Sequence, residues 1–60
     1  LSLDRLLEAL PDAQCRAIEL VKIDGLSISE ASASTGQSES LVKVNIHRGL
    51  KRLAALIERA

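Results

Sequence analysis

The chain has 60 residues, with eight Lys and Arg against eight Asp and Glu, one Cys and no Phe, Tyr or Trp. This length permits one domain, residues 1–60, with one small aliphatic core, which suits closely packed helices. The composition excludes an aromatic platform for single-stranded bases and an internal disulfide framework, and no apolar run approaches the ~20 residues of a membrane span.

The net charge of zero hides an asymmetry along the chain. Residues 1–36 carry three Lys and Arg against six Asp and Glu, a charge of −3, whereas residues 37–60 carry five against two, a charge of +3. Such a division favours an oriented encounter with a polyanion through the basic half. A solvated basic helix face without a partner is the alternative interpretation.

The leucines near the N-terminus predict a short first helix. Four of them recur at the i, i+3, i+4 and i+7 spacing of one helical face: Leu3, Leu6, Leu7 and Leu10. Ser2 is the expected N-cap, and Pro11 should end the helix because the residue before a proline is pushed out of the helical region.

A second helix is expected from about Pro11 to Asp24, since Gly25 supplies the left-handed residue that commonly follows a helix. Its predicted inward residues are Ala13, Ala17, Leu20 and Val21, with Ile18 at their edge. The alternation typical of strands is absent. We therefore predict an all-α fold, a small four-helix domain without a wing or other β elements.

Residues 27–57 predict a helix-turn-helix. Ser27 and Glu30 have the spacing of a capping box at the start of a third helix that runs to about Ser34. Gly36 is the expected positive-φ residue of the turn, and Ser38 is the expected cap of a longer fourth helix that continues to about residue 57 or 58. Two helices joined by a tight turn, the second of them cationic, are the parts of a helix-turn-helix DNA reader.

The fourth helix has a continuous inward stripe, made of Val42, Ile46, Gly49, Leu53 and Leu56 or Ile57. A glycine within a helix costs about 1 kcal/mol relative to alanine, so Gly49 on this stripe predicts the close approach of another helix. The third helix has small inward residues, and we expect that enlarging Ala31 or Gly36 would overpack the turn.

The opposite side of the fourth helix predicts a surface for double-helical DNA. It carries Ser40, Lys43, Val44, His47, Arg48 and Lys51, with Arg52 nearby. Ser40, Lys43, Val44 and Arg48 lie near the helix start, where side chains contact base edges. Arg48 suits guanine O6 and N7, and Val44 suits a thymine methyl group. Lys51 and Arg52 are expected to meet phosphates.

Other functional classes find little support in the sequence. His47 has no Cys or His partner at metal-ligand spacing, so no metal is expected, and Cys15 is expected to be a semi-buried, inert thiol. The sequence contains no phosphate-binding glycine loop, nucleophile elbow or plausible carboxylate pair. We therefore expect no enzyme activity and no cofactor.

Four sequence motifs resemble region 4 of the bacterial sigma-70 family, most closely its extracytoplasmic-function subgroup. They are Leu10-Pro11-Asp12-Ala13-Gln14, Gly25-Leu26-Ser27, Ser38-Glu39-Ser40-Leu41-Val42-Lys43-Val44 and His47-Arg48-Gly49-Leu50-Lys51-Arg52-Leu53. The resemblance covers about residues 6–57. The combined spacing is fairly specific, whereas each motif alone is weak.

The resemblance implies that the last helix recognises the −35 promoter element in the major groove. The DNA-facing segment of the family falls on Lys43, Val44, Asn45, His47 and Arg48. The family often has Thr at position 41, Ser at 44 and Arg at 45, where this chain has Leu, Val and Asn. These departures bear on the promoter sequence rather than on the mode of binding.

The resemblance also implies partners beyond promoter DNA. They are core RNA polymerase, contacted through the flap of its β subunit, and an anti-sigma protein. It implies a bacterial cytoplasmic, nucleoid-associated location without membrane insertion. The chain starts with Leu1 rather than Met, and we expect it to belong to a longer protein with a second sigma domain.

Two other functions stay open at this point. The run from Ser38 to Val44 is also similar to the DNA-binding domain of LuxR-type response regulators, although the Leu-Pro pair and the segment 47–53 favour the sigma family. Alternatively, the leucine-rich first helix and the acidic half serve mainly as a protein-interaction module that is held by an anti-sigma protein.

Overall fold

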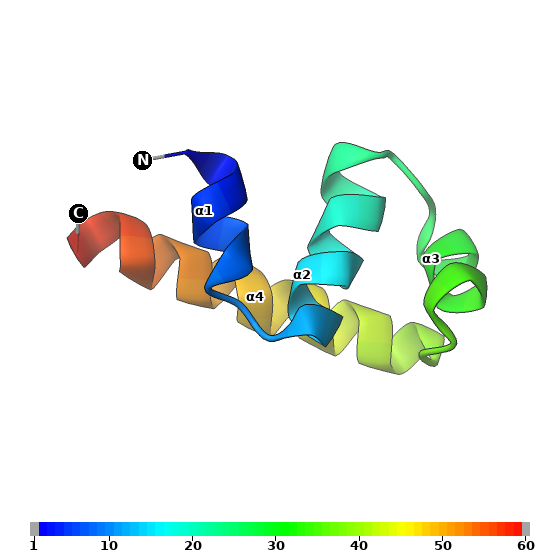
Figure 1. The fold of residues 1–60 in the computed structure, drawn as a ribbon. Coiled ribbons are helices and arrows are strands. Elements are labelled where there is room, and N and C mark those ends of the chain that lie inside the picture. The colour runs from blue at the N-terminus through cyan, green and yellow to red at the C-terminus, as the bar shows by residue number, and fades with distance from the viewer. Residues whose placement is uncertain (1, 60) are drawn as a thin grey trace.

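The computed structural model describes residues 2–59, which are helical apart from short connections (Figure 1). The elements are α1 (Leu3–Glu8), α2 (Asp12–Ile18), the π-helix η1 (Glu19–Ile23), α3 (Ile28–Thr35) and α4 (Glu39–Arg59). No strand occurs among residues 2–59. The predicted all-α class and the predicted helix-turn-helix, formed by α3 and α4, are confirmed.

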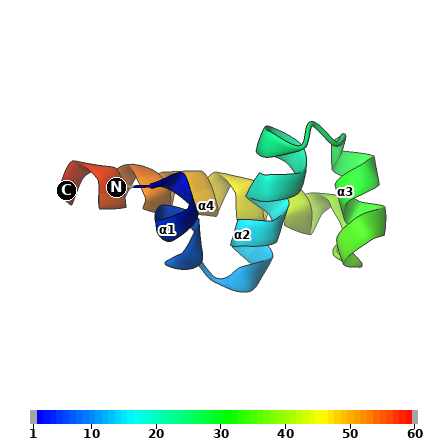
Figure 2. The ribbon, with the colours of Figure 1, turned by 45° about the horizontal axis from the view of Figure 1, so that its top comes forward.

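Helix α4 is the long axis of the molecule. Its 21 residues correspond to a rod of about 31 Å, and the molecule is 34 Å long. In Figures 1 and 2 the other helices lie against one side of this rod, with α1 and α2 near its middle and C-terminal part and α3 at its N-terminal end. In both views none of the other described helices, between residues 2 and 59, covers the opposite side of α4.

Helix α1 starts as predicted but is shorter. The Ser2 hydroxyl accepts a hydrogen bond from the Arg5 backbone N–H at 3.3 Å, so Ser2 is the N-cap. Leu7 and Leu10 are buried, and Leu6 is partly buried. Leu3 is 53% exposed, so its predicted inward position is wrong. Helix α1 has only six residues, and it packs on α4 through its second turn, whereas Leu3 lies in the first turn.

The second predicted helix consists of two parts. Pro11 is the N-cap rather than the first helical residue, and the last turns form the π-helix η1, in which the Asp24 N–H donates to the Glu19 carbonyl at 2.8 Å. The predicted inward face is partly wrong, since Ile18 is buried while Ala13 is exposed. The reason is that α4 approaches α2 along the side of Gln14 and Ile18, not along the side of Ala13.

Helix α3 and its turn are held by local hydrogen bonds. The Ser27 hydroxyl accepts from the Glu30 N–H at 3.0 Å, and the Glu30 carboxylate accepts from the Ser27 N–H at 2.9 Å, which confirms the predicted capping box. The hydrogen bond that the Glu30 carboxylate accepts from the Ser27 backbone N–H is the main reason that the pKa of Glu30 is lowered. Gly36 has the predicted left-handed backbone, with φ at +78°.

The prediction that a larger residue at Gly36 would overpack the turn is wrong. A Cβ added there would meet no atom within 4 Å, so an added side chain would not overpack the turn. A side chain at this position is instead disfavoured by the positive φ itself, because the left-handed conformation brings Cβ close to the following carbonyl oxygen. Ala31 is completely buried, as expected for a packed position.

The core is divided into two clusters along α4. Near α1 it contains Leu7, Leu10, Ile18 and Leu53, and near α3 it contains Ala17, Ala31, Val42 and Ile46. The predicted stripe of α4 is therefore confirmed from Val42 to Leu53. At its end Leu56 is partly buried and Ile57 is exposed, because the stripe continues on one of these two neighbouring positions only.

Candidate nucleic-acid interface

The start of α4 is fixed by the turn that precedes it. The Ser38 hydroxyl accepts a hydrogen bond from the Leu41 backbone N–H at 3.1 Å, which confirms Ser38 as the cap. The capped turn leaves Ser40 exposed in the first turn of the helix, directly beyond the helix-turn-helix connection. The N-terminal end of α4 is therefore fixed in place by the helix-turn-helix connection.

Seven of the eight predicted DNA-contacting residues lie exposed on α4. They are Ser40, Lys43, Val44, His47, Arg48, Lys51 and Arg52. From the first to the last they span about 18 Å of helix. Val44 is 40% exposed among polar neighbours, so an apolar side chain is presented to solvent within this surface. We call these seven residues the basic face.

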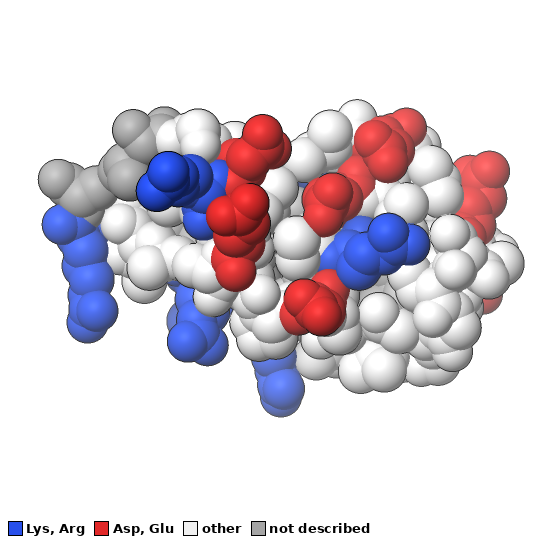
Figure 3. Space-filling model, in the orientation of Figure 1, with Lys and Arg blue, Asp and Glu red and all other residues white. Residues whose placement is uncertain are grey.

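The charges of the molecule are separated in space as well as in sequence. Helix α4 carries five Lys and Arg against two Glu, a net charge of +3. In Figure 3 most acidic side chains gather on the upper side, over α1 and α2, whereas Lys and Arg side chains project from the lower edge along α4. A polyanion that meets the lower edge therefore encounters more cations than carboxylates.

Asn45 is the exception among the predicted contact residues. Its side chain is only 8% exposed, and its Nδ2 donates a hydrogen bond of 2.7 Å to Oε1 of Gln37. The prediction that Asn45 faces DNA is therefore wrong. The reason is visible on a helical wheel, where residue 45 lies 60° from Val42 and thus beside the inward stripe. The family resemblance indicates only that residue 45 belongs to the DNA-facing segment, whereas the helical period places it beside the core.

Gln37 is a structural residue that the sequence analysis missed. It lies in the turn, where a glutamine gives no signal of its own, and its side chain is recruited by Asn45 eight residues later. Its backbone is bonded too: the Ser32 hydroxyl donates to the Gln37 carbonyl at 2.6 Å, and the Gln37 N–H donates to Thr35 Oγ1 at 3.2 Å.

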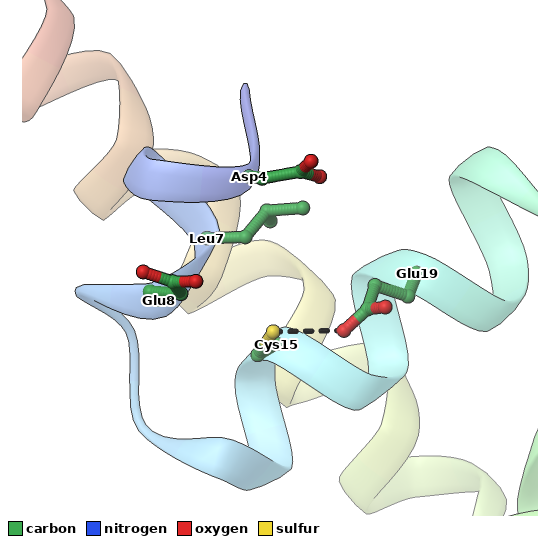
Figure 4. Close-up of a pocket in the computed structure, with 5 residues that line it drawn as sticks. All are labelled: Asp4, Leu7, Glu8, Cys15 and Glu19. Atoms are coloured by element: carbon green, nitrogen blue, oxygen red, sulfur yellow. Dashed lines mark hydrogen bonds between the residues drawn. The ribbon is translucent and has the colours of Figure 1, made fainter. Parts of the chain in front are cut away.

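A second surface feature is an acidic pocket of about 270 Å³ between α1 and α2 (Figure 4). It is lined by Asp4, Leu7, Glu8, Cys15 and Glu19. The Cys15 thiol donates a hydrogen bond of 2.9 Å to the Glu19 carboxylate, and this bond is the main reason that the pKa of Cys15 is raised to about 11. A thiol that keeps its proton is a poor nucleophile and a poor metal ligand, in agreement with the predicted inert role.

Among residues 2–59 no group of three or more His, Cys, Asp and Glu side chains is arranged to hold a metal ion. None of the described helices combines the length and the apolar character needed to span a membrane.

Comparison with known proteins gives two matches. Residues 1–53 match the family model described as sigma-70, region 4, a DNA-binding regulatory domain that is not an enzyme. The whole chain is 48% identical, over 60 residues, to the ECF RNA polymerase sigma factor SigF of Caulobacter vibrioides (strain NA1000 / CB15N). The chain spans 34% of the length of that relative. No solved structure matches significantly.

The family match decides between the two helix-turn-helix classes that the sequence left open. It covers the capping box, the turn and the basic face, and it ends at Leu53, the last buried residue of the α4 stripe. The LuxR interpretation is therefore not retained. The chain belongs to the region 4 family of sigma-70 factors, and its similarity to SigF points to the extracytoplasmic-function type.

Proposed function

We propose that the chain recognises the −35 element of bacterial promoters, with the N-terminal half of α4 in the major groove, and thereby directs an RNA polymerase to initiate transcription. The observation that carries this proposal is the basic face, which is exposed and lies on the side of α4 that no other helix covers. An α-helix fits the major groove, and its cations neutralise phosphates with release of counterions.

The side chains of the basic face divide into two roles. Arg48 is proposed to bind the O6 and N7 atoms of a guanine, and Val44 to contact a thymine methyl group. Ser40 and Lys43 lie in the first turns and reach neighbouring base edges, with His47 beside them. Lys51 and Arg52 lie one turn further along and are proposed to bind phosphates, which contribute affinity but no base preference.

The test compares two variants in binding to duplex DNA. Arg48→Ala should relax the preference at one or two base pairs, with a loss of about 1–3 kcal/mol on the preferred sequence. Lys51→Ala should weaken binding to all sequences alike and reduce the slope of log K against log salt by about 1. The affinities are measured by fluorescence anisotropy at several salt concentrations.

Arg5→Ala is the matched control, because Arg5 is an exposed cation on α1, the helix whose Leu7 packs in one core cluster with Leu53 on the inward stripe of α4. It should leave both the base preference and the salt slope unchanged. Binding that does not depend on salt, or an Arg48 variant that behaves like the Lys51 variant, would contradict the proposed roles.

We infer that the domain also contacts protein, namely the β-subunit flap of core RNA polymerase or an anti-sigma protein. We propose that it does so in the cytoplasm of a bacterium, at the nucleoid. This role is supported by a groove of about 240 Å³ that overlaps the edge of the basic face. Its lining combines four apolar side chains with three polar ones: Val21, Ile28, Ile46 and Leu50 with Lys22, Lys43 and His47. A protein partner can fill the apolar part of this lining, whereas phosphates have no apolar groups that could do so. Leu50→Asp should weaken binding to core polymerase, whereas Ile57→Asp, on an exposed residue outside the groove, should not.

A further inference from the structure

The strongest unexplained feature near the basic face is the buried hydrogen bond between Asn45 and Gln37. Among residues 2–59, Asn45 is the one polar side chain that the fold buries as deeply as its apolar core, at 8% exposed. Its partner lies in the turn and not on α4. An amide placed in an apolar region is costly unless it is hydrogen-bonded, so the bond ties the two residues together.

The same turn residue is also anchored to α3. The Gln37 carbonyl accepts from the Ser32 hydroxyl at 2.6 Å, and the Gln37 N–H donates to Thr35 Oγ1 at 3.2 Å. Thr35 Oγ1 in turn donates to the Ala31 carbonyl at 2.8 Å. A chain of hydrogen bonds therefore runs from the last turns of α3 through Gln37 to the second turn of α4.

This polar chain does something that the neighbouring core does not do. The core holds α4 against α3 through Val42 and Ile46, but the hydrophobic effect has no preferred direction, so these contacts define the rotation of α4 about its axis less sharply than a hydrogen bond does. A hydrogen bond has a preferred length and angle. Asn45 lies at the edge of the packed stripe, so a bond from its side chain resists rotation of α4 relative to α3.

The rotation of α4 matters because Asn45 adjoins the base-contacting part of the basic face. Val44 precedes it in the chain, and Arg48 lies one turn further on, at i+3, on the same flank of the helix. Bidentate contact with a guanine needs both hydrogen bonds at once, so it tolerates little rotation. Phosphate contacts through long, flexible lysines tolerate more.

We propose that Asn45 and Gln37 are positioning residues that set the rotation of α4 and so determine base preference without touching DNA. The proposal rests on the function proposed above. It predicts that breaking the bond reduces selectivity between duplexes and leaves the salt-dependent, sequence-independent part of binding nearly intact.

The experiment measures a base-preference profile for the full-length protein by selection from a library of random duplexes, followed by affinities for the preferred duplex and for single-base changes. The variants are Asn45→Leu, which replaces the amide by an apolar side chain of similar size in the buried position, and Gln37→Ala, which removes the acceptor from a partly exposed residue. Each should lower the ratio between preferred and changed duplexes about fivefold or more, as expected when one bidentate contact is impaired.

Two further variants separate positioning from stability. Leu53→Val removes one methylene group from the core cluster near α1, far from the turn. It should lower the melting temperature but keep the profile. Gln37→Glu keeps the acceptor for Asn45 Nδ2, so it should keep the selectivity ratio even though its charge lowers the affinity for all duplexes. The Asn45→Leu and Gln37→Ala effects on the ratio should not add in the double variant, since both break one bond.

The outcomes are distinct. A wild-type protein that binds no duplex overturns the proposed function, and this inference with it. A wild-type protein that binds selectively, with Asn45→Leu and Gln37→Ala variants whose profiles match that of the Leu53→Val control, overturns the positioning role alone. If Asn45→Leu prevents folding, Gln37→Ala decides, because its side chain is partly exposed and its loss leaves the core intact.

Discussion

Gly49 on α4 and Ile18 on α2 lie so close together that a Cβ added to Gly49 would stand 2.5 Å from Cδ1 of Ile18 and 3.4 Å from its Cγ1. This short distance confirms the close approach of another helix that the sequence predicts at Gly49. Glycine within a helix is otherwise disfavoured by about 1 kcal/mol. The missing side chain of Gly49 makes room for Ile18, which is buried at the junction of α2 with α4.

We expect Gly49→Ala to lower the melting temperature, because Ile18 is only 3% exposed and its Cδ1 can move away from the added Cβ only within the packed core. Overpacking there costs typically about 1–3 kcal/mol, more than the gain in helix propensity. Ile18→Val removes the atom that clashes, and alone it should cost about 0.5–1.5 kcal/mol. The double variant should lose less stability than the sum of the losses in the two single variants. Thermal unfolding followed by circular dichroism measures all three, and strict additivity would show that the two residues are not in contact.

Ala31 gives a second packing prediction. It is fully buried in α3, whereas Ala33 on the same helix is exposed. Ala31→Leu should destabilise the fold by about 1–3 kcal/mol, which corresponds to roughly 4–8 °C per kcal/mol in a domain of this size. Ala33→Leu adds the same side chain to the same helix and should change the melting temperature little. Equal melting temperatures for the two variants would refute the packing of α3.

Cys15 gives a prediction about reactivity. Its ordinary pKa is 9.0, and the hydrogen bond to Glu19 raises it to about 11. The rate of alkylation by iodoacetamide should therefore reach half its maximum near pH 11, and Glu19→Gln should lower that midpoint. Glu8→Gln is the control, since Glu8 lines the same pocket without bonding the thiol. Because the folded thiol holds its proton more tightly than the unfolded one, its contribution to stability is lost as the pH rises from 9 to 11.

The capping box of α3 gives a prediction about acid. Hydrogen bonds from Ser27 lower the pKa of Glu30 below its ordinary value of 4.5, so the folded protein favours the charged carboxylate. The contribution of Glu30 to stability is thus present above pH 4.5 and is lost as the pH falls through the lowered value. Ser27→Ala should cost about 1 kcal/mol at neutral pH, because it removes the cap, but it keeps the backbone N–H that donates to Glu30. Glu30→Gln removes the ionisable group and should abolish the dependence on pH. Melting temperatures between pH 3 and pH 6 measure both effects, and an unchanged slope in the Glu30→Gln variant would contradict the assignment.

The features that the sequence predicted well depend on residues close together in the chain. The capping box joins Ser27 and Glu30, and the left-handed turn depends on Gly36 alone, so local geometry is sufficient for both. The basic face follows from the helical period of α4, because seven of its predicted members lie on the side that the core leaves exposed.

The features that the sequence did not predict depend on contacts between distant elements. The π-helix Glu19–Ile23 and the inward position of Ile18 reflect the path of α4 across α2, which no local pattern encodes. The position of Asn45 in a motif predicts a contact with DNA, whereas the fold pairs Asn45 with Gln37 across the turn. Motif position indicates which helix carries function, but the side on which each residue lies is decided by packing.

The separation of charge between α4 and the α1–α2 side has a consequence for the approach to DNA. At zero net charge the domain feels little overall pull from a distant duplex, and screening removes most of the field beyond about 8–10 Å. Within that range, its separated charges act as an electric dipole that experiences a torque. This torque rotates a domain that approaches with its carboxylates in front, so that the basic face turns toward the duplex before the two molecules come into contact.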